Sequence, residues 1–119
     1  MKRILVVVLL VAGCGSAANE DSFLLDEGSI IGPDVIQQGA GELEIENIGE
    51  FNHTMLVTDE QGNAVAATGV LAPGTSTVLA VDLPEGNYQV SCRLVGQDSE
   101  GNIVDHYELG MFKQVEVVG

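Results

Sequence analysis

Few side chains in this sequence offer the nitrogen or sulfur donors that bind transition metals such as copper. Apart from the first methionine and a cysteine near the N-terminus, they are the thiol of Cys92, the imidazoles of His53 and His106, and the thioethers of Met55 and Met111. Imidazole, thiolate and thioether groups together suit both common oxidation states of copper. Zinc also accepts histidine and cysteine, but a thioether is a poor zinc ligand.

Cys92 lies in a segment with the alternation of a half-buried strand. Tyr88, Val90, Cys92 and Leu94 share one face, which the pattern predicts to be the inner face. On this observation alone, Cys92 is either a small core residue or a metal ligand.

The other donors also have simple structural readings when each is taken alone. His53 could be a surface residue at the start of a strand, and His106 a polar residue near a turn. Met111 could fill a gap in the core. Only their order along the chain, considered below, favours a common role.

The rest of the chain predicts strands and turns, with no amphipathic helical stretch of useful length. In Glu42–Glu46, acidic and apolar residues alternate with the period of a half-buried strand. Gly-, Pro- and Asn-containing turns separate the segments. Further strands are expected at residues 54–58, 75–83, 87–95, 103–107 and 112–118. Short strands with regular turns predict an all-β fold, a two-sheet antiparallel sandwich.

Three motifs resemble those of one known family. They are Asn47-Ile48-Gly49-Glu50-Phe51-Asn52-His53, then Gly86-Asn87-Tyr88 leading to Cys92, then His106-Tyr107-Glu108-Leu109-Gly110-Met111, with the turn Leu71-Ala72-Pro73-Gly74 between the first two. In this order they resemble the cupredoxins, the plastocyanin- and azurin-like blue copper proteins. The resemblance covers residues 30–119 and implies a Greek-key β-sandwich.

The resemblance also implies a ligand set. Copper would be held by His53, Cys92 and His106, with Met111 as a weak axial ligand. Two features depart from the family pattern. Residues 93–105 separate the cysteine from the second histidine, which are usually only a few residues apart, and Thr54 follows the first histidine where an asparagine is usual.

The long insert has an internal turn signal. Ser99-Glu100-Gly101-Asn102 is a good hairpin turn, so the chain could leave as one strand and return beside it. We therefore expect a projecting β-hairpin beside the copper site. Its two strands would bring the ends of the insert together and so place His106 next to Cys92.

These expectations predict an electron-transfer protein in which one mononuclear type 1 copper cycles between Cu(I) and Cu(II). A redox partner would dock over an exposed histidine, most simply His106. The alternatives are copper storage or delivery, and a metal-free sandwich that serves as a binding module. We expect no enzyme, because a second copper centre for a substrate would need more histidines than His53 and His106.

The N-terminus predicts export. Residues 1–13 have a basic start and a short apolar run, as in a cleaved signal peptide. Val11-Ala12-Gly13-Cys14 resembles the lipobox of bacterial lipoproteins, which implies that Cys14 is lipidated and anchors the protein to a membrane on the extracytoplasmic side, in the periplasm or at the cell surface. The alternative is an ordinary signal peptide with a stray cysteine. The expected parts are then a tether over residues 14–27 and a copper-binding domain over residues 28–119.

The charge of the chain limits its partners. Once the signal is removed, Arg93 and Lys113 are the basic residues left against eighteen acidic ones. Such a surface repels nucleic acid and anionic lipid head groups. It is either a solvated surface or a docking surface for a redox protein with a basic face, and we expect the chain itself to be a monomer.

Overall fold

The computed structural model describes residues 20–119. The expected signal peptide, Cys14 and the first part of the expected tether lie outside the described residues. Within the described part of the chain, no helix is long and apolar enough to cross a membrane.

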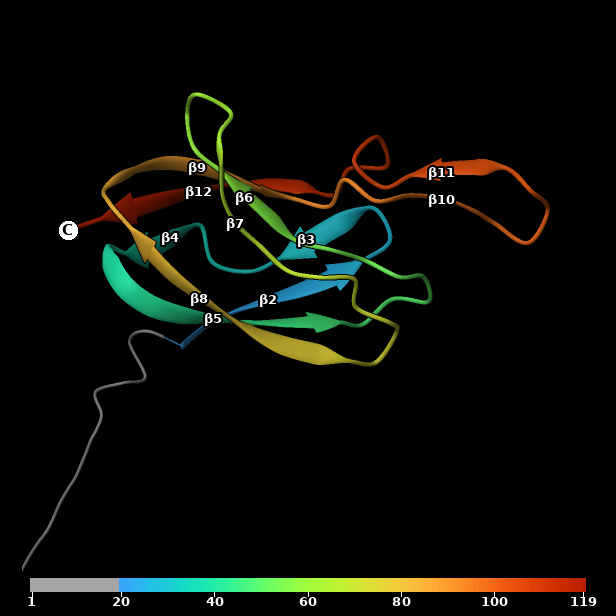
Figure 1. Ribbon diagram of the computed structural model, residues 1–119, viewed down its shortest axis with the longest axis horizontal. Helices are drawn as coiled ribbons and strands as arrows, with labels where there is room; N and C mark the ends of the chain where they lie inside the picture. The colour runs from blue at the N-terminus through green and yellow to red at the C-terminus, as the bar shows by residue number, and fades with distance from the viewer. Residues whose placement is uncertain (1–19) are drawn as a thin grey trace, which may run out of the picture.

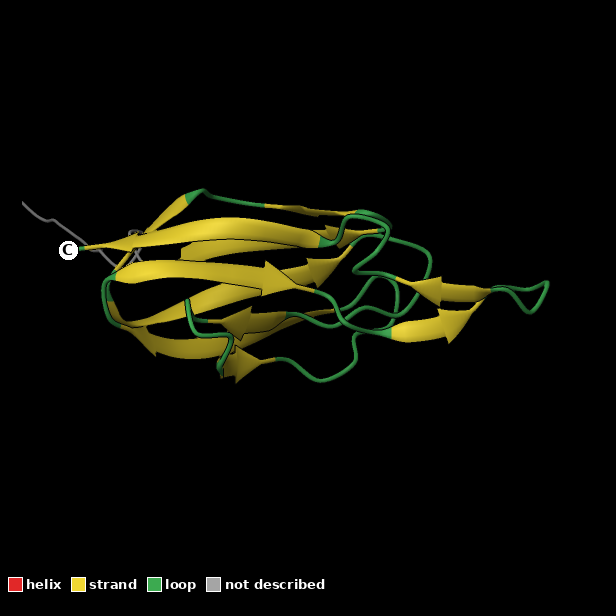
Figure 2. Cartoon of the chain, turned by 90° about the horizontal axis from the view of Figure 1, so that it is seen from above, coloured by secondary structure: helices red, strands yellow, loops and turns green. Residues whose placement is uncertain are grey.

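Over residues 20–119 the chain forms two main β-sheets that pack face to face, as Figure 1 and Figure 2 show. One sheet has the order β3-β2-β5-β8 and the other the order β4-β12-β9-β6-β7. The strands of the first sheet are β2 (Glu20–Asp26), β3 (Ser29–Ile31), β5 (Gly39–Asn47) and β8 (Ser76–Leu83). Those of the second are β4 (Val35–Gln37), β6 (Leu56–Thr58), β7 (Ala64–Ala67), β9 (Gly86–Ser91) and β12 (Phe112–Val118). The predicted β-sandwich is confirmed.

The core lies between the sheets and follows the period-two pattern of the strands. Leu43 and Ile45 of β5 point inward while the acidic residues between them are exposed. Tyr88 and Val90 of β9 are buried, as expected, and so is Cys92, which directly follows this strand. Each inward side chain removes apolar surface from water, which is the main force that holds the two sheets together.

Two strand pairings differ from the all-antiparallel expectation. β2 pairs in parallel with β5, and β4 pairs in parallel with β12. The sequence predicts no strand for either β2 or β4. The chain passes repeatedly from one sheet to the other, and such crossings allow neighbouring strands to run in the same direction.

The expected boundary between tether and domain at residue 28 is wrong. Strand β2 is an inner strand of its sheet, with β3 on one side and β5 on the other. Phe23 and Leu25 of this strand are almost completely buried in the core. The small and polar residues before Phe23 predict a tether, but the contribution of two large apolar side chains to the core outweighs that local composition.

The insert between Cys92 and His106 forms the predicted hairpin. β10 (Val95–Gln97) pairs antiparallel with β11 (Ile103–Asp105) in a two-stranded sheet of their own. The hairpin projects beyond the ends of the main sheets (Figures 1 and 2). Its turn is closed by Asp98, whose carboxylate accepts hydrogen bonds from the backbone N–H groups of Glu100 and Asn102.

Candidate metal centre

His53, Cys92 and His106 come together in the structure, although 53 positions separate the two histidines. Their ligand atoms lie within 4.8 Å of one another. His53 Nδ1 is 3.2 Å from His106 Nδ1, and Cys92 Sγ is 4.0 Å from the former and 3.5 Å from the latter. All three side chains are buried. Among the described residues, these three form the group of histidine, cysteine and acidic side chains that could hold a metal ion.

The separations between the donor atoms are those of ligands around one ion. For metal–nitrogen bonds of about 2.0 Å and metal–sulfur bonds of about 2.3 Å, trigonal geometry places two nitrogens about 3.5 Å apart and nitrogen and sulfur about 3.7 Å apart. The observed distances scatter around these values. The spacing alone does not separate copper from zinc, so the choice rests on donor chemistry and fold.

Backbone pairing explains how distant segments reach this point. His53 forms an isolated bridge with Leu71, with hydrogen bonds in both directions at 3.0 and 2.8 Å. The backbone N–H of His106 donates to the carbonyl of Leu94 at 3.2 Å. This last bond joins the two ends of the insert, so the hairpin returns His106 to the neighbourhood of Cys92 as the sequence predicted.

Met111 is fully buried beside the two later donors. The backbone N–H of Cys92 donates to the carbonyl of Met111 at 3.0 Å, and the N–H of Met111 donates to the carbonyl of His106 at 3.1 Å. Backbone hydrogen bonds therefore connect Met111 directly to both Cys92 and His106. Such a position is consistent with a role for the thioether at the same centre.

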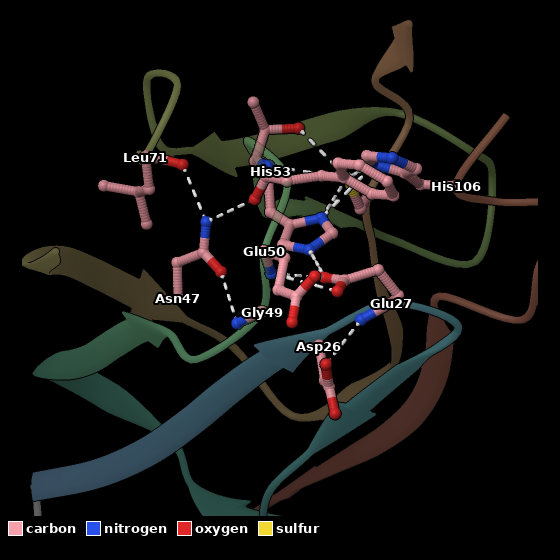
Figure 3. Close-up of polar contacts among 11 residues, drawn as sticks. Asp26, Glu27, Asn47, Gly49, Glu50, His53, Leu71 and His106 are labelled. Atoms are coloured by element: carbon pink, nitrogen blue, oxygen red, sulfur yellow. Dashed lines mark hydrogen bonds and ion pairs between the residues drawn. The ribbon is translucent and has the colours of Figure 1, made fainter. Parts of the chain in front are cut away.

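Asn47 organises the loop that carries His53 (Figure 3). Its side chain is completely buried and its amide donates to the carbonyls of Phe51 and Leu71 at 2.8 and 2.9 Å. Its side-chain oxygen accepts from the N–H of Gly49 at 2.8 Å. These bonds give a physical reason for the Asn-x-Gly motif, since one side chain satisfies three backbone groups that the loop leaves without strand partners.

Thr54 contacts the sulfur of Cys92. Its backbone N–H donates to Sγ at 3.4 Å, and its hydroxyl oxygen lies 3.7 Å from the same atom. A hydrogen bond to sulfur withdraws electron density from a thiolate. The replacement of the usual asparagine by threonine therefore leaves a backbone donor in contact with the sulfur.

Glu27 contacts the outer nitrogen of His53, a relationship that sequence reasoning missed. Its Oε2 lies 2.8 Å from His53 Nε2, and both carboxylate oxygens accept from the backbone N–H of Glu50 at 2.9 and 3.1 Å (Figure 3). Burial raises the pKa of Glu27, but the bond from Glu50 and the interactions with His53 outweigh it, so the pKa is below its usual value. No local signal could have found Glu27, because it lies in the segment predicted to be a tether, 26 residues away from His53.

His106 is the donor nearest to the surface, but the exposure expected of it is wrong. Its side chain is 3% exposed and lies at a groove of about 460 Å³. The groove runs between the loop at Phe51 and the hairpin residues Val95 and Val104. The ring of Phe51 is stacked over that of His106 at an interplanar angle of 14°. Burial, then the charge of His53, lowers the pKa of His106, which keeps this imidazole neutral and able to bind a metal at neutral pH.

Comparison with known proteins gives matches at the level of structure. No protein-family model matches the sequence, and no curated protein is significantly similar to it. The dithionite-reduced auracyanin of the photosynthetic bacterium Roseiflexus castenholzii is 17% identical, with a TM-score of 0.66 over 85% of this chain and 98% of that one. Auracyanin A of Chloroflexus aurantiacus, described as a "blue" copper protein, is 11% identical, with a TM-score of 0.60 over 83% and 99% of the two chains.

A larger protein contains the same kind of domain. The copper-containing nitrite reductase of Thermus scotoductus is 16% identical, with a TM-score of 0.55 over 85% of this chain and 31% of that one. At these identities the similarity shows the fold. The chain has the cupredoxin fold, and its buried cluster of two histidines and one cysteine, with Met111 nearby, fits a copper site.

Proposed function

We propose that this chain is an electron-transfer protein with one mononuclear type 1 copper site. The observation that carries the proposal is the convergence of His53 Nδ1, Cys92 Sγ and His106 Nδ1, all buried, in a cupredoxin fold. Bound copper would supply a one-electron couple between Cu(I) and Cu(II). The chain's own part is to hold three donors at nearly fixed separations, so that little rearrangement accompanies the gain or loss of an electron.

We propose that the thioether of Met111 would hold the copper as a fourth, weaker ligand. Its backbone is bonded to both Cys92 and His106, so its position is fixed together with theirs. A fully buried thioether is a soft donor that favours copper over zinc at this donor set.

Electrons would enter and leave at the groove beside His106. This imidazole is the part of the ligand set that lines a surface depression, and the rim includes Phe51 and the hairpin. We propose a redox partner with a basic docking face, because the chain carries eighteen acidic residues and few basic ones. We also propose that the chain is not an enzyme, since both of its histidines belong to this one cluster.

Export and anchoring remain part of the proposal. The basic start, the short apolar run and the Val-Ala-Gly-Cys sequence support a lipid on Cys14 and an extracytoplasmic location. Replacing Cys14 by Ser should release the protein from the membrane fraction or leave it unprocessed. A Cys14→Ser protein that is cleaved normally and stays in the membrane would contradict the anchor.

The visible absorption spectrum of the copper-loaded protein tests the site. We expect an intense blue band in the oxidised protein that disappears on reduction and returns on oxidation. Replacing Cys92 by Ser should abolish the band, because an alkoxyl oxygen is a hard and weakly covalent donor. Cys14→Ser, which alters the other cysteine, is the matched control and should keep the colour. Tight colourless binding of Cu(I), or no copper uptake at all, would contradict electron transfer and favour storage or a metal-free role.

A further inference from the structure

Glu27 is held against His53 by contacts that fix both ends of the carboxylate. Besides Nε2 of His53 at 2.8 Å, it accepts from the backbone N–H of Glu50. The backbone N–H of Glu27 itself donates to the side chain of Asp26 at 2.8 Å. Strand β2 ends directly before this residue, so the position of the carboxylate is set by an inner strand of the sandwich.

Gly49 provides the space that this contact needs. A Cβ atom added to Gly49 would collide with Oε2 of Glu27 and would lie 2.9 Å from Nε2 of His53. No backbone angle requires glycine here, because Gly49 is not among the residues with positive φ. Glycine at this position is therefore explained by the close approach of the carboxylate and the imidazole.

The contact determines which nitrogen of His53 carries the proton. A carboxylate is an acceptor, so Nε2 of His53 must donate to it. In the neutral ring, Nδ1 then has a free lone pair, and Nδ1 is the atom that faces Cys92 and His106. A hydrogen-bonded carboxylate of this kind orients a metal-binding histidine and makes it a more basic ligand.

The contact also places a negative charge close to the cluster. The side chain of Glu27 is 28% exposed and His53 is fully buried, so solvent screens their interaction less than it would at the surface. A negative charge next to a ligand favours the more positive of two metal oxidation states. For a copper couple, that state is Cu(II).

We propose that Glu27 is a positioning residue that fixes the Nε2–H tautomer of His53 and lowers the reduction potential of the copper centre. The effect on the reduction potential rests on the proposed function. The effect on the tautomer of His53 concerns the metal-free protein as well. Glu27 acts through His53 and contributes no atom to the set of donors.

The first test measures reduction potential in Glu27→Gln and Glu27→Ala. Glu27→Gln removes the charge and keeps an acceptor, whereas Glu27→Ala removes both. We expect the potential of Glu27→Gln to rise with the blue band retained, by about 59 mV if Cu(II) affinity falls about tenfold relative to Cu(I). The control is Glu46→Gln, which removes the same charge from an exposed position on β5. Equal shifts in the two Gln variants, or no shift in Glu27→Gln, would overturn the effect on potential.

A second variant disturbs the contact between Glu27 and His53 without changing either residue. Gly49→Ala keeps the Glu27 side chain but expels it from its position, so its potential should also rise. Melting temperatures of all variants identify any that lose the fold. If Glu27→Gln does not fold, Gly49→Ala decides the question, and an unchanged potential there would count against the proposal.

The tautomer is read without copper. Nitrogen NMR of the metal-free wild type should show His53 protonated at Nε2, and Glu27→Ala should give a mixture of tautomers. A wild-type protein that binds no copper would sink the proposed function, but this spectrum would still decide the role of Glu27. An unchanged His53 tautomer in Glu27→Ala would overturn that role even in a protein that is blue.

Discussion

The backbone N–H of Thr54 points at the sulfur of Cys92 across 3.4 Å, while the hydroxyl of the same residue is farther away, at 3.7 Å. The backbone N–H and the hydroxyl belong to different parts of one residue, so their contacts with the sulfur can be separated by substitution. The backbone donor is retained with any side chain except proline.

We expect Thr54→Val to retain the blue band and to change the reduction potential by much less than Glu27→Gln does. The reason is that the shorter hydrogen bond to the sulfur comes from the backbone, which valine preserves. Redox titration measures the shift, and Thr54→Ser, which keeps the hydroxyl, is the control. A large shift in the valine variant alone would show that the hydroxyl is the more important contact of Cys92.

Replacing Met111 by Leu should keep the colour and raise the reduction potential. Loss of a weak axial donor and a more apolar site both favour Cu(I) over Cu(II). The matched control is Met55→Leu, because Met55 is equally buried but belongs to the segment of the first histidine, two residues after His53. Comparable shifts in the two variants would mean that the core, and not an axial thioether, sets the change.

Asn47→Ala should lower the free energy of unfolding by about 2–4 kcal/mol, because three backbone groups lose their buried partner. Denaturant unfolding of the metal-free protein measures the loss. Asn63→Ala, at an exposed turn, should cost much less. A loss below about 0.5 kcal/mol in Asn47→Ala would indicate that water replaces the amide without penalty.

Shortening the hairpin should spare the metal centre. Gly96 and Val104 face each other in the register, so residues 97–103 can be replaced by Asn-Gly, which favours a two-residue turn. The bond between His106 and Leu94 lies outside the deletion, so copper content and melting temperature should change little. Electron transfer to the proposed redox partner should change, because the deletion removes Gln97 from the rim of the groove at His106 together with the projecting tip of the hairpin.

Two results would contradict this expectation. Loss of copper in a protein that still folds would mean that the hairpin itself positions His106. Unchanged electron transfer to every native partner would remove the proposed docking role.

The donors could be predicted from sequence because each is a rare residue in a motif with its own turn or strand pattern. The inward face of β9 follows from alternation, and the hairpin follows from one turn signal. By contrast, Glu27 is one of eighteen acidic residues, and nothing in its neighbours indicates that it contacts His53.

The place of β2 in the sandwich also could not be predicted from the residues near it in the sequence. Its pairing with β5 is parallel and joins Phe23 to Ile45, which are 22 positions apart. Such a contact depends on how the whole chain crosses between the sheets. The polar residues before Phe23 indicate a tether when they are read alone, and only the burial of Phe23 and Leu25 in the assembled core reverses that interpretation.

If Cys14 carries the proposed lipid, the direction of β2 bears on how the molecule stands on a membrane. The strand starts at Glu20 and ends next to Glu27, so its seven residues span about 20 Å from the end nearest Cys14 to the metal centre. An anchor at Cys14 would therefore hold the opposite end of the sandwich toward the lipid. In such an arrangement we expect His106 and the hairpin to face proteins that approach from the aqueous side.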